Sequence, residues 1–166
     1  MPYIDIPGHE DPVVGVWQVR PEQGAAALAW THANWRHSVL STREREAARH
    51  RVAQLNGCLT CQSWRVDGFA EVGADEAFYD GVAEGRADPR YSRREQLAIE
   101  LAERFSLSWT DIGEDFMYEL RRHYTDEEVV DLMLCIAQYV AQGRLIHILG
   151  LDVVCPTAPS ALAVAR

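Results

Sequence analysis

The sequence predicts an all-helical protein, and three observations support this fold class. A capping box, in which two side chains satisfy backbone donors at a helix start, occurs three times, at Ser41–Glu44, Ser92–Glu95 and Thr125–Glu128. Between Val129 and Val140 the apolar residues recur at the helical period. Strand-like alternation is confined to two short pieces, residues 3–6 and 13–19.

We expect a compact helical bundle that forms one domain over residues 1–166, because neither side of a weak boundary at residues 85–89 is large enough to fold well alone. Asn56-Gly57 ends the second helix, since both residues tolerate the left-handed conformation. The Pro- and Ala-rich tail is expected to be loose. In chain order, the predicted helices are residues 21–37, 42–56, 58–72, 74–84, 92–107, 111–124 and 125–149.

Composition and charge narrow the classes of function. The net charge of -9 and the pI of about 5.1 argue against general nucleic-acid binding and against anionic membrane surfaces, because both need a basic face. The N-terminus lacks the basic start and apolar run of a signal peptide, and no stretch approaches the roughly 18 apolar residues of a membrane span. We therefore expect a cytoplasmic protein with neither nucleic acid nor a membrane as a partner.

Cys58 and Cys61 form a Cys-x-x-Cys pair at a predicted helix start. In a reducing cytoplasm such a pair indicates redox or metal chemistry rather than a structural disulfide. The free amide groups of a helix start stabilise a thiolate and lower the thiol pKa. One cysteine then attacks an electrophilic sulfur or oxygen, and the other resolves the product into a disulfide.

Two other interpretations of the pair stay open. A zinc site needs about four ligands, but the remaining cysteines, Cys135 and Cys155, are far away and differently spaced. We therefore expect neither a metal nor a cofactor. Alternatively, the two cysteines are small buried side chains, as non-disulfide cysteines often are.

Charged residues near the pair suggest a polar group beneath the thiols. If the cysteine helix returns antiparallel to the preceding one, Arg65 lies level with His50, and Glu46 lies one turn further. The alternative is that all three are solvated, because the helix is heavily charged. Periodicity places Glu46 in solvent, since the apolar stripe of this helix consists of Ala48, Val52 and Leu55.

Two further polar residues, Arg144 and His147, fall on the apolar face of the last helix when its stripe is extended. A charged residue on a buried face needs a partner or a function. The alternative is a helix end that has reached the surface, with both side chains solvated.

The stretch "LSTREREAARHRVAQLNGCLTC" resembles the carboxymuconolactone decarboxylase-like superfamily, in particular its alkylhydroperoxidase D-like branch. The shared features are an Arg-Glu near the start of a helix, an apolar helix, Asn-Gly-Cys and Cys-x-x-Cys. The resemblance continues through "YSRREQLAIELAERFSL", "DFMYELRRHYTDEEVVDLMLCIAQYVAQGRL" and "HILGLD", and covers about residues 30 to 152.

This resemblance implies an all-helical homo-oligomer, a trimer or a hexamer, that reduces hydroperoxides with its cysteine pair. Glu46 stands twelve residues before the first cysteine, the position of a proton-relay glutamate in such enzymes. The partners it implies are a small hydroperoxide and a dithiol reductant.

The sequence departs from the peroxidase motif Cys-x-x-Cys-x-x-x-His, because Arg65 stands at the histidine position. Arginine stays charged near neutral pH and does not pass protons. It either pairs with Glu46 or adds positive charge that favours thiolate. His50 and His147 are alternative sources of an imidazole. Gly143-Arg144 stands where the family usually has Asn-Arg on its last helix.

Three functions follow from these observations. The first is a thiol-dependent peroxidase that uses Cys58, Cys61 and Glu46. The second is a disulfide reductase or redox sensor that uses the same pair with weak peroxide turnover, an alternative favoured by the missing histidine. The third is a non-redox decarboxylase or isomerase; the decarboxylase branch of the superfamily generally lacks the cysteine pair.

Overall fold

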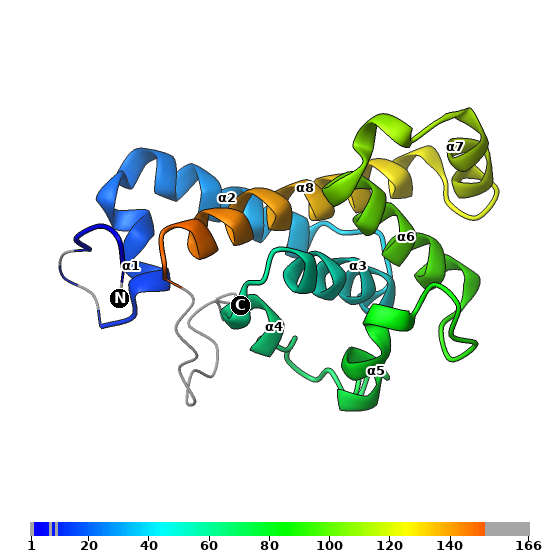
Figure 1. The fold of residues 1–166 in the computed structure, drawn as a ribbon, viewed down its shortest axis with the longest axis horizontal. Helices are drawn as coiled ribbons and strands as arrows, with labels where there is room; N and C mark the ends of the chain where they lie inside the picture. Colours follow the sequence, from blue (N-terminus) through cyan, green and yellow to red (C-terminus); the bar gives the residue numbers. More distant parts are fainter. Residues whose placement is uncertain (1, 7, 9, 152–166) are drawn as a thin grey trace.

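The computed structural model describes residues 2–6, 8 and 10–151, and it confirms the predicted all-helical fold class. Helices account for all regular structure in this part of the chain, which contains no strand (Figure 1). The predicted loose tail and Cys155 lie outside the described residues. The helices are α1 (Pro12–Val19), α2 (Pro21–Arg36), α3 (Thr42–Leu55), α4 (Leu59–Ser63), α5 (Glu76–Gly81), α6 (Arg93–Leu107), α7 (Glu114–Arg121) and α8 (Asp126–Ile148), with short 3-10 helices at Val82–Glu84 and Trp109–Asp111.

All three predicted capping boxes are present. In each, the hydroxyl of the capping residue accepts from a backbone N–H three residues on, and the glutamate there accepts from the backbone N–H of the cap. These contacts fix the starts of α3, α6 and α8, the helices that build the main core, by interactions within four residues of sequence.

Neither of the two segments with strand-like alternation forms a strand. Residues 13–19 belong to α1, which begins with Asp11 as its N-cap, accepting from the Val13 N–H at 2.8 Å, and with Pro12 in its first turn. Proline is favoured there because its missing N–H would be unsatisfied anyway. Residues 3–6 form no strand. Alternation of apolar and polar residues over so few positions does not distinguish a strand from a helix.

The predicted helix over residues 58–72 is also wrong beyond its first turn. It ends at Ser63, and Trp64 is extended, with φ of -70° and ψ of 141°. The chain then forms turns in which Gly68 and Gly73 have φ of +67° and +73°. Glycine adopts these angles readily, whereas other residues rarely do.

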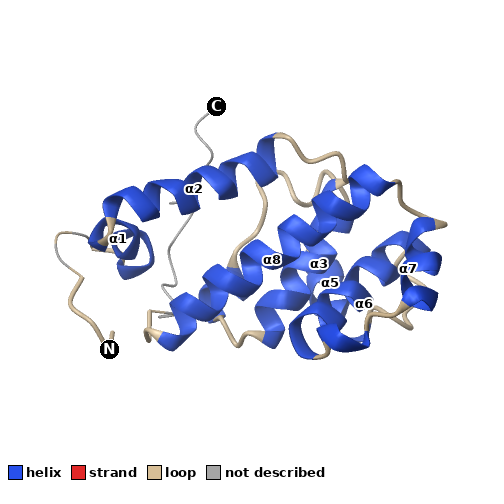
Figure 2. Ribbon diagram, turned by 90° about the horizontal axis from the view of Figure 1, so that it is seen from above, coloured by secondary structure: helices blue, strands red, loops and turns tan. Residues whose placement is uncertain are grey.

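The main core lies where α3 packs against α6 and α8. Seen from above, α2 runs along one side of α8, and α3 lies on its other side (Figure 2). The buried apolar side chains of this core come mainly from α3, α6, α7 and α8, and are Leu40, Ala48, Val52, Leu97, Ala98, Leu101, Ala102, Phe116, Leu120, Tyr124, Val129, Leu132 and Ile136.

Helix α3 is buried over most of its surface although its sequence is highly charged. Most of its charges form ion pairs, mainly with α6, whereas Arg45 lies over the ring of Trp35. Arg43 pairs with Glu95 at 2.5 Å, and Arg51 pairs with Glu103 at 2.8 Å. Charged groups leave water at tolerable cost only when they are paired and hydrogen-bonded. The sequence pattern of α3 is typical of a solvated helix, yet α3 lies at the centre of the bundle.

By length and composition alone, helix α8 is long and apolar enough to cross a membrane, which corrects the expectation that no stretch approaches a membrane span. A core helix meets the same criterion, and α8 packs against α2, α3 and α6. Its contact with α2 is polar: Asn34 Nδ2 donates to Gln138 Oε1 at 2.7 Å, and Gln138 Nε2 donates to Thr31 Oγ1 at 3.0 Å. This arrangement identifies α8 as a core helix of the bundle.

Candidate thiol redox site

The two cysteines lie side by side at the junction of α3 and α4. Gly57, with φ of +66°, ends α3 and reverses the chain. Cys58 is the N-cap of α4, and its Sγ accepts from the Cys61 N–H at 3.3 Å. The two Sγ atoms are 2.6 Å apart. The sequence prediction that one turn of helix brings the thiols together is therefore met.

Solvent reaches the two cysteines differently. Cys58 is fully buried in a small apolar cluster with Val16, Ile146 and Leu151. Cys61 is partly exposed. A small molecule arriving from solvent therefore meets Cys61 first.

The expected effect of a helix start on the thiols is weaker than the sequence suggested. Helix α4 has five residues, Leu59–Ser63, and the field at a helix end arises from several aligned turns of peptide dipoles. Any tuning of these thiols must come largely from surrounding side chains.

Glu46 is fully buried, which corrects the prediction from periodicity that it lies in solvent. Its carboxylate accepts from Arg49 Nε at 2.9 Å, from Arg49 Nη2 at 2.9 Å and from the Tyr79 hydroxyl at 2.7 Å. Both oxygens are therefore engaged by strong donors. The prediction from periodicity was wrong because Glu46 is buried together with the side chains that donate hydrogen bonds to it.

Arg49 is one of the residues of this site that the sequence reasoning missed. It is fully buried, and its Nη1 and Nη2 donate to the carbonyl oxygens of Cys61 at 2.6 Å and Trp64 at 3.2 Å. Burial opposes its charge, but the carboxylate of Glu46 outweighs burial and raises the Arg49 pKa. The only sequence signal was the Glu-x-x-Arg spacing, which places two side chains on one helix face.

Tyr79 on α5 completes the buried cluster. Burial, together with the neighbouring charge of Glu46, raises the pKa of the Tyr79 hydroxyl above its usual value. The hydroxyl therefore stays protonated and donates to Glu46. The sequence reasoning gave no indication of this residue, because its contact with Glu46 joins positions 33 residues apart.

Arg65 does not form the ion pair with Glu46 that the sequence allowed. Its guanidinium binds the exposed carboxylate of Glu76 at 2.8 Å and donates to the Gln62 carbonyl at 2.6 Å. It also lies 4.1 Å from the centre of the Tyr79 ring. The prediction assumed a longer helix, whereas the chain turns away after Ser63.

His50 is buried against Tyr79, with the two ring centres 5.1 Å apart. Its Nδ1 has no hydrogen-bond partner among the described residues. Burial, followed by the positive charges of Arg49 and Arg65, lowers the His50 pKa to about 3. His50 is therefore neutral at physiological pH and a weak base, which argues against it as a substitute for the missing motif histidine.

Replacing His50 with glutamine should change how stability depends on pH. The folded state excludes a proton that unfolded histidine binds below its ordinary pKa of 6.5. Stability from the neutral ring is therefore complete above about pH 6.5 and is lost as pH falls toward 3, by on the order of 4 kcal/mol. Urea unfolding from pH 7 to pH 4 should give a shallower decline for His50→Gln than for the wild-type chain. Parallel declines would contradict this assignment.

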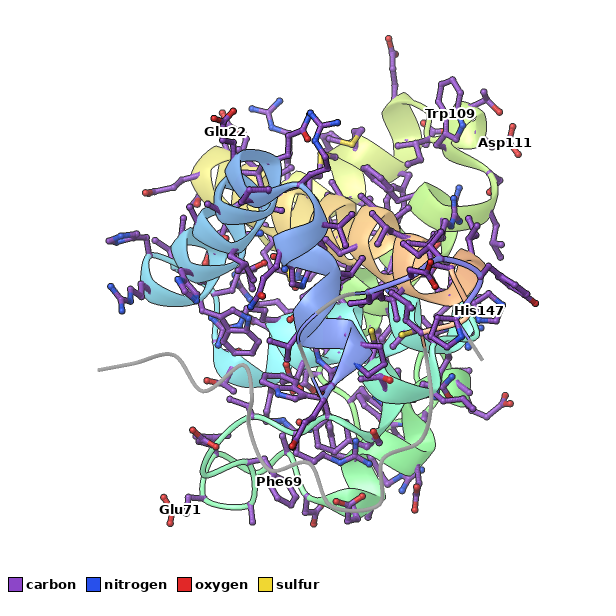
Figure 3. All side chains as sticks on the ribbon, turned by 90° about the vertical axis from the view of Figure 1, so that its left-hand side faces the viewer. Glu22, Phe69, Glu71, Trp109, Asp111 and His147 are labelled. Atoms are coloured by element: carbon purple, nitrogen blue, oxygen red, sulfur yellow. The ribbon has the colours of Figure 1, made fainter. Side chains whose placement is uncertain are left out.

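His147 lies at the surface on the last turns of α8 (Figure 3). Its ring atoms are 3.6–3.9 Å from the point where a Cβ on Gly57 would lie. The imidazole thus packs over the glycine that immediately precedes Cys58. Of the two histidines that the sequence offered, His147 is the exposed one beside the cysteine turn.

Arg144 supports the same turn from α8. Its Nε donates to Asn56 Oδ1 at 3.1 Å, and its Nη2 donates to the Ser106 carbonyl at 2.8 Å. A Cβ on Gly143 would lie only 2.6 Å from Asn56 Nδ2. Glycine at position 143 therefore leaves the room that Asn56 occupies. Arg144 acts on the turn before the cysteines rather than on the sulfurs themselves.

Metal binding receives no support from the part of the chain that the structure describes, where no group of three or more His, Cys, Asp or Glu side chains is placed to hold an ion. Cys135 lies apart in the core, and burial raises its thiol pKa to about 12. A thiol of this kind is almost wholly protonated at neutral pH, so Cys135 is a poor nucleophile.

The overall structure is that of AhpD-like proteins, as comparison with solved structures shows. A protein of unknown function from Agrobacterium tumefaciens, described as a candidate antioxidant defence protein AhpD, superposes with a TM-score of 0.70 at 20% identity, covering 81% of this chain and 92% of that one. An alkylhydroperoxidase AhpD core from Ralstonia eutropha JMP134, described as an uncharacterized peroxidase-related protein, gives 0.72 at 21% identity, covering 87% and 77%.

A third structure, an uncharacterized peroxidase-related protein from Silicibacter sp. TM1040, gives a TM-score of 0.71 at 20% identity, covering 84% of this chain and 74% of that one. In sequence, the chain is 27% identical over 139 residues to the uncharacterized protein YdfG of Bacillus subtilis (strain 168), covering 82% of this chain and 93% of YdfG. No family model matches the sequence.

Proposed function

We propose that this chain is a thiol-dependent peroxidase of the alkylhydroperoxidase D-like branch of the carboxymuconolactone decarboxylase-like superfamily. The observation that carries the proposal is the pair of sulfur atoms 2.6 Å apart, one buried and one partly exposed. The AhpD-like fold and the peroxidase-related descriptions of its structural neighbours support it.

The exposed thiol, Cys61, reacts first. Its sulfur attacks the terminal oxygen of a hydroperoxide, so that an S–O bond forms and the O–O bond breaks. The leaving alkoxide takes up a proton as an alcohol, and Cys61 becomes a sulfenic acid. The sulfur of Cys58 then displaces this oxygen as water and closes the disulfide. A dithiol reductant restores both thiols, so the pair passes two electrons to the peroxide in each cycle.

His147 is the side chain that we assign to proton transfer in place of the missing motif histidine. It is exposed and packs over Gly57, next to Cys58. His147→Gln should lower the rate of peroxide reduction by about 10²-fold, a usual contribution of a general acid or base. An unchanged rate and pH profile in the variant would remove His147 from the mechanism.

The rival function is a disulfide reductase or redox sensor with slow peroxide turnover, and one observation favours it. Glu46, the relay carboxylate that the family resemblance implies, has its oxygens engaged by Arg49 and Tyr79. A carboxylate held this way by a guanidinium is a poor carrier of protons. The balance between the two functions then depends on whether another group, such as His147, carries the proton.

One assay separates the candidate functions. Reduced protein is mixed with cumene hydroperoxide and dithiothreitol, and loss of the peroxide is followed alongside reduction of an added disulfide. Peroxide turnover that depends on both Cys58 and Cys61 supports the peroxidase. Disulfide reduction with negligible peroxide turnover identifies the reductase. Neither activity, in a folded chain, would point to the non-redox decarboxylase or isomerase.

We further propose that the protein is a homo-oligomer that assembles through α8. The outward face of this helix carries large exposed apolar side chains at helical spacing: Val130, Leu134, Leu145 and Ile148. Exposed apolar stripes of this kind commonly mark an interface.

Leu134→Arg should therefore shift the protein to smaller species in sedimentation velocity, because it buries a charge in the proposed interface. Leu107→Arg, at an exposed leucine on α6, is the matched control and should sediment like the wild-type chain. A wild-type chain that is monomeric at 100 µM, or equal behaviour of the two variants, would exclude an interface at this stripe.

A further inference from the structure

Helix α4, which holds the two sulfurs together, is too short to be stable by itself. Its five residues amount to little more than one turn, and a single turn fixes many dihedral angles for very few internal hydrogen bonds. Both of its ends are held instead by hydrogen bonds other than the backbone hydrogen bonds within the helix. At its start, Cys58 Sγ accepts from the Cys61 N–H.

At the other end, Arg49 binds two carbonyl oxygens that lack donors within the short helix, those of Cys61 and Trp64. Its Nη1 reaches the Cys61 oxygen at 2.6 Å, and its Nη2 reaches the Trp64 oxygen at 3.2 Å. Arg65 Nη1 also donates to the Trp64 oxygen, at 3.0 Å. The last carbonyls of any helix lack intrahelical donors, and a guanidinium fork can serve two of them at once.

The guanidinium is itself held rigidly. Two of its nitrogens bind the Glu46 carboxylate, both side chains are fully buried, and the ring of Trp64 lies 5.0 Å from the Arg49 Cζ atom. Glu46 in turn accepts from Tyr79. The carbonyl of Cys61 is therefore fixed relative to α3 through a chain of close, charge-assisted hydrogen bonds.

We propose that Arg49 is the positioning residue of the thiol pair: by tying the carbonyl end of α4 to Glu46, it keeps the turn formed and the two sulfur atoms facing one another in both the dithiol and the disulfide state. This inference rests on the proposed redox function of the pair. It also assigns Glu46 the role of anchoring Arg49 rather than carrying protons. Without Arg49, the turn frays and the sulfurs sample larger separations, so that the disulfide closes less readily.

The test is the equilibrium between the protein and glutathione, in which the protein dithiol and one glutathione disulfide exchange to give the protein disulfide and two glutathione thiols. The Glu46→Gln/Arg49→Met variant removes the tie without leaving a lone buried charge. Its equilibrium constant for disulfide formation should fall at least tenfold, equivalent to about 30 mV in reduction potential. Arg49→Lys, which keeps the charge but loses the fork, should show a fall of at least threefold.

The matched control is Arg51→Met/Glu103→Gln, which removes a partly exposed arginine–glutamate pair, 2.8 Å apart, that joins α3 to α6. It should keep the wild-type equilibrium constant within twofold, because Arg51 donates to Glu103 and Gln54 and not to the cysteine turn. Thermal unfolding of each variant in both redox states confirms that the chain compared is folded. If the Glu46→Gln/Arg49→Met variant does not fold, Arg49→Lys decides.

Wild-type equilibrium constants in folded Arg49 variants would overturn the proposal, as would an equal fall in the Arg51→Met/Glu103→Gln control. A wild-type chain that exchanges with glutathione but does not consume peroxide would contradict the proposed peroxidase. The glutathione equilibrium constants of the Arg49 variants would still decide the role of Arg49. A wild-type chain that forms no Cys58–Cys61 disulfide in any glutathione buffer would overturn both.

Discussion

We expect Cys61→Ser to abolish hydroperoxide reduction, with a loss of at least about a thousandfold in rate, because the substitution removes the attacking nucleophile. Cys61 is assigned this role because it is the partly exposed member of the pair. Cys58→Ser should behave differently. It also stops turnover, but it should still react once with peroxide and leave a sulfenic acid on Cys61 that a dimedone probe traps.

The control is Cys135→Ala. Cys135 is buried in the core, and burial raises its pKa to about 12, so its removal should leave turnover within about twofold of the wild-type rate. The assay is peroxide consumption with dithiothreitol as the reductant. Full activity in Cys61→Ser, or dimedone labelling at Cys58 instead of Cys61, would contradict the assigned order of attack.

Removing one member of the Glu46–Arg49 pair should give the largest loss of stability of any substitution near the site. Both side chains are fully buried and joined by hydrogen bonds of 2.9 Å. Arg49→Met leaves an uncompensated buried carboxylate, and Glu46→Gln leaves an uncompensated buried guanidinium. Each should cost about 3–5 kcal/mol, which lowers the melting temperature by about 10 °C for a chain of this size.

The double variant tests this explanation. Because Glu46→Gln/Arg49→Met leaves no lone charge, its loss of stability should be clearly smaller than the sum of the two single losses, by at least about 1 kcal/mol in a double-mutant cycle. Arg121→Met, at a largely exposed pair with Asp126, should barely change the melting temperature. Additive losses in the cycle would mean that the two side chains stabilise the protein independently.

Local signals in the sequence were enough for most of the fold. The capping boxes at Ser41, Ser92 and Thr125 start α3, α6 and α8 where they were predicted, because each box is completed within four residues. The adjacency of Cys58 and Cys61 follows equally locally from the end of α3 at Gly57 and the turn that follows it.

The remainder of the site depends on contacts between distant segments, which periodicity does not report. Glu46 was placed in solvent because it lies off the apolar stripe of its helix, yet Tyr79 donates to it from 33 residues away. Arg49 went unnoticed because its targets at the cysteine turn are backbone carbonyls, and carbonyls leave no trace in the residue pattern. Arg65 was misplaced because the length of α4 was overestimated.

The most direct test of the central claim is a single turnover. The reduced protein is mixed with one equivalent of hydroperoxide, its thiols are counted, and its disulfides are mapped by mass spectrometry. We predict that two thiols are lost per chain, that the product links Cys58 to Cys61, and that one equivalent of alcohol appears. Unchanged thiols in the folded wild-type chain, or an equal yield of alcohol from the Cys58→Ser/Cys61→Ser variant, would contradict the claim that this pair is the redox centre.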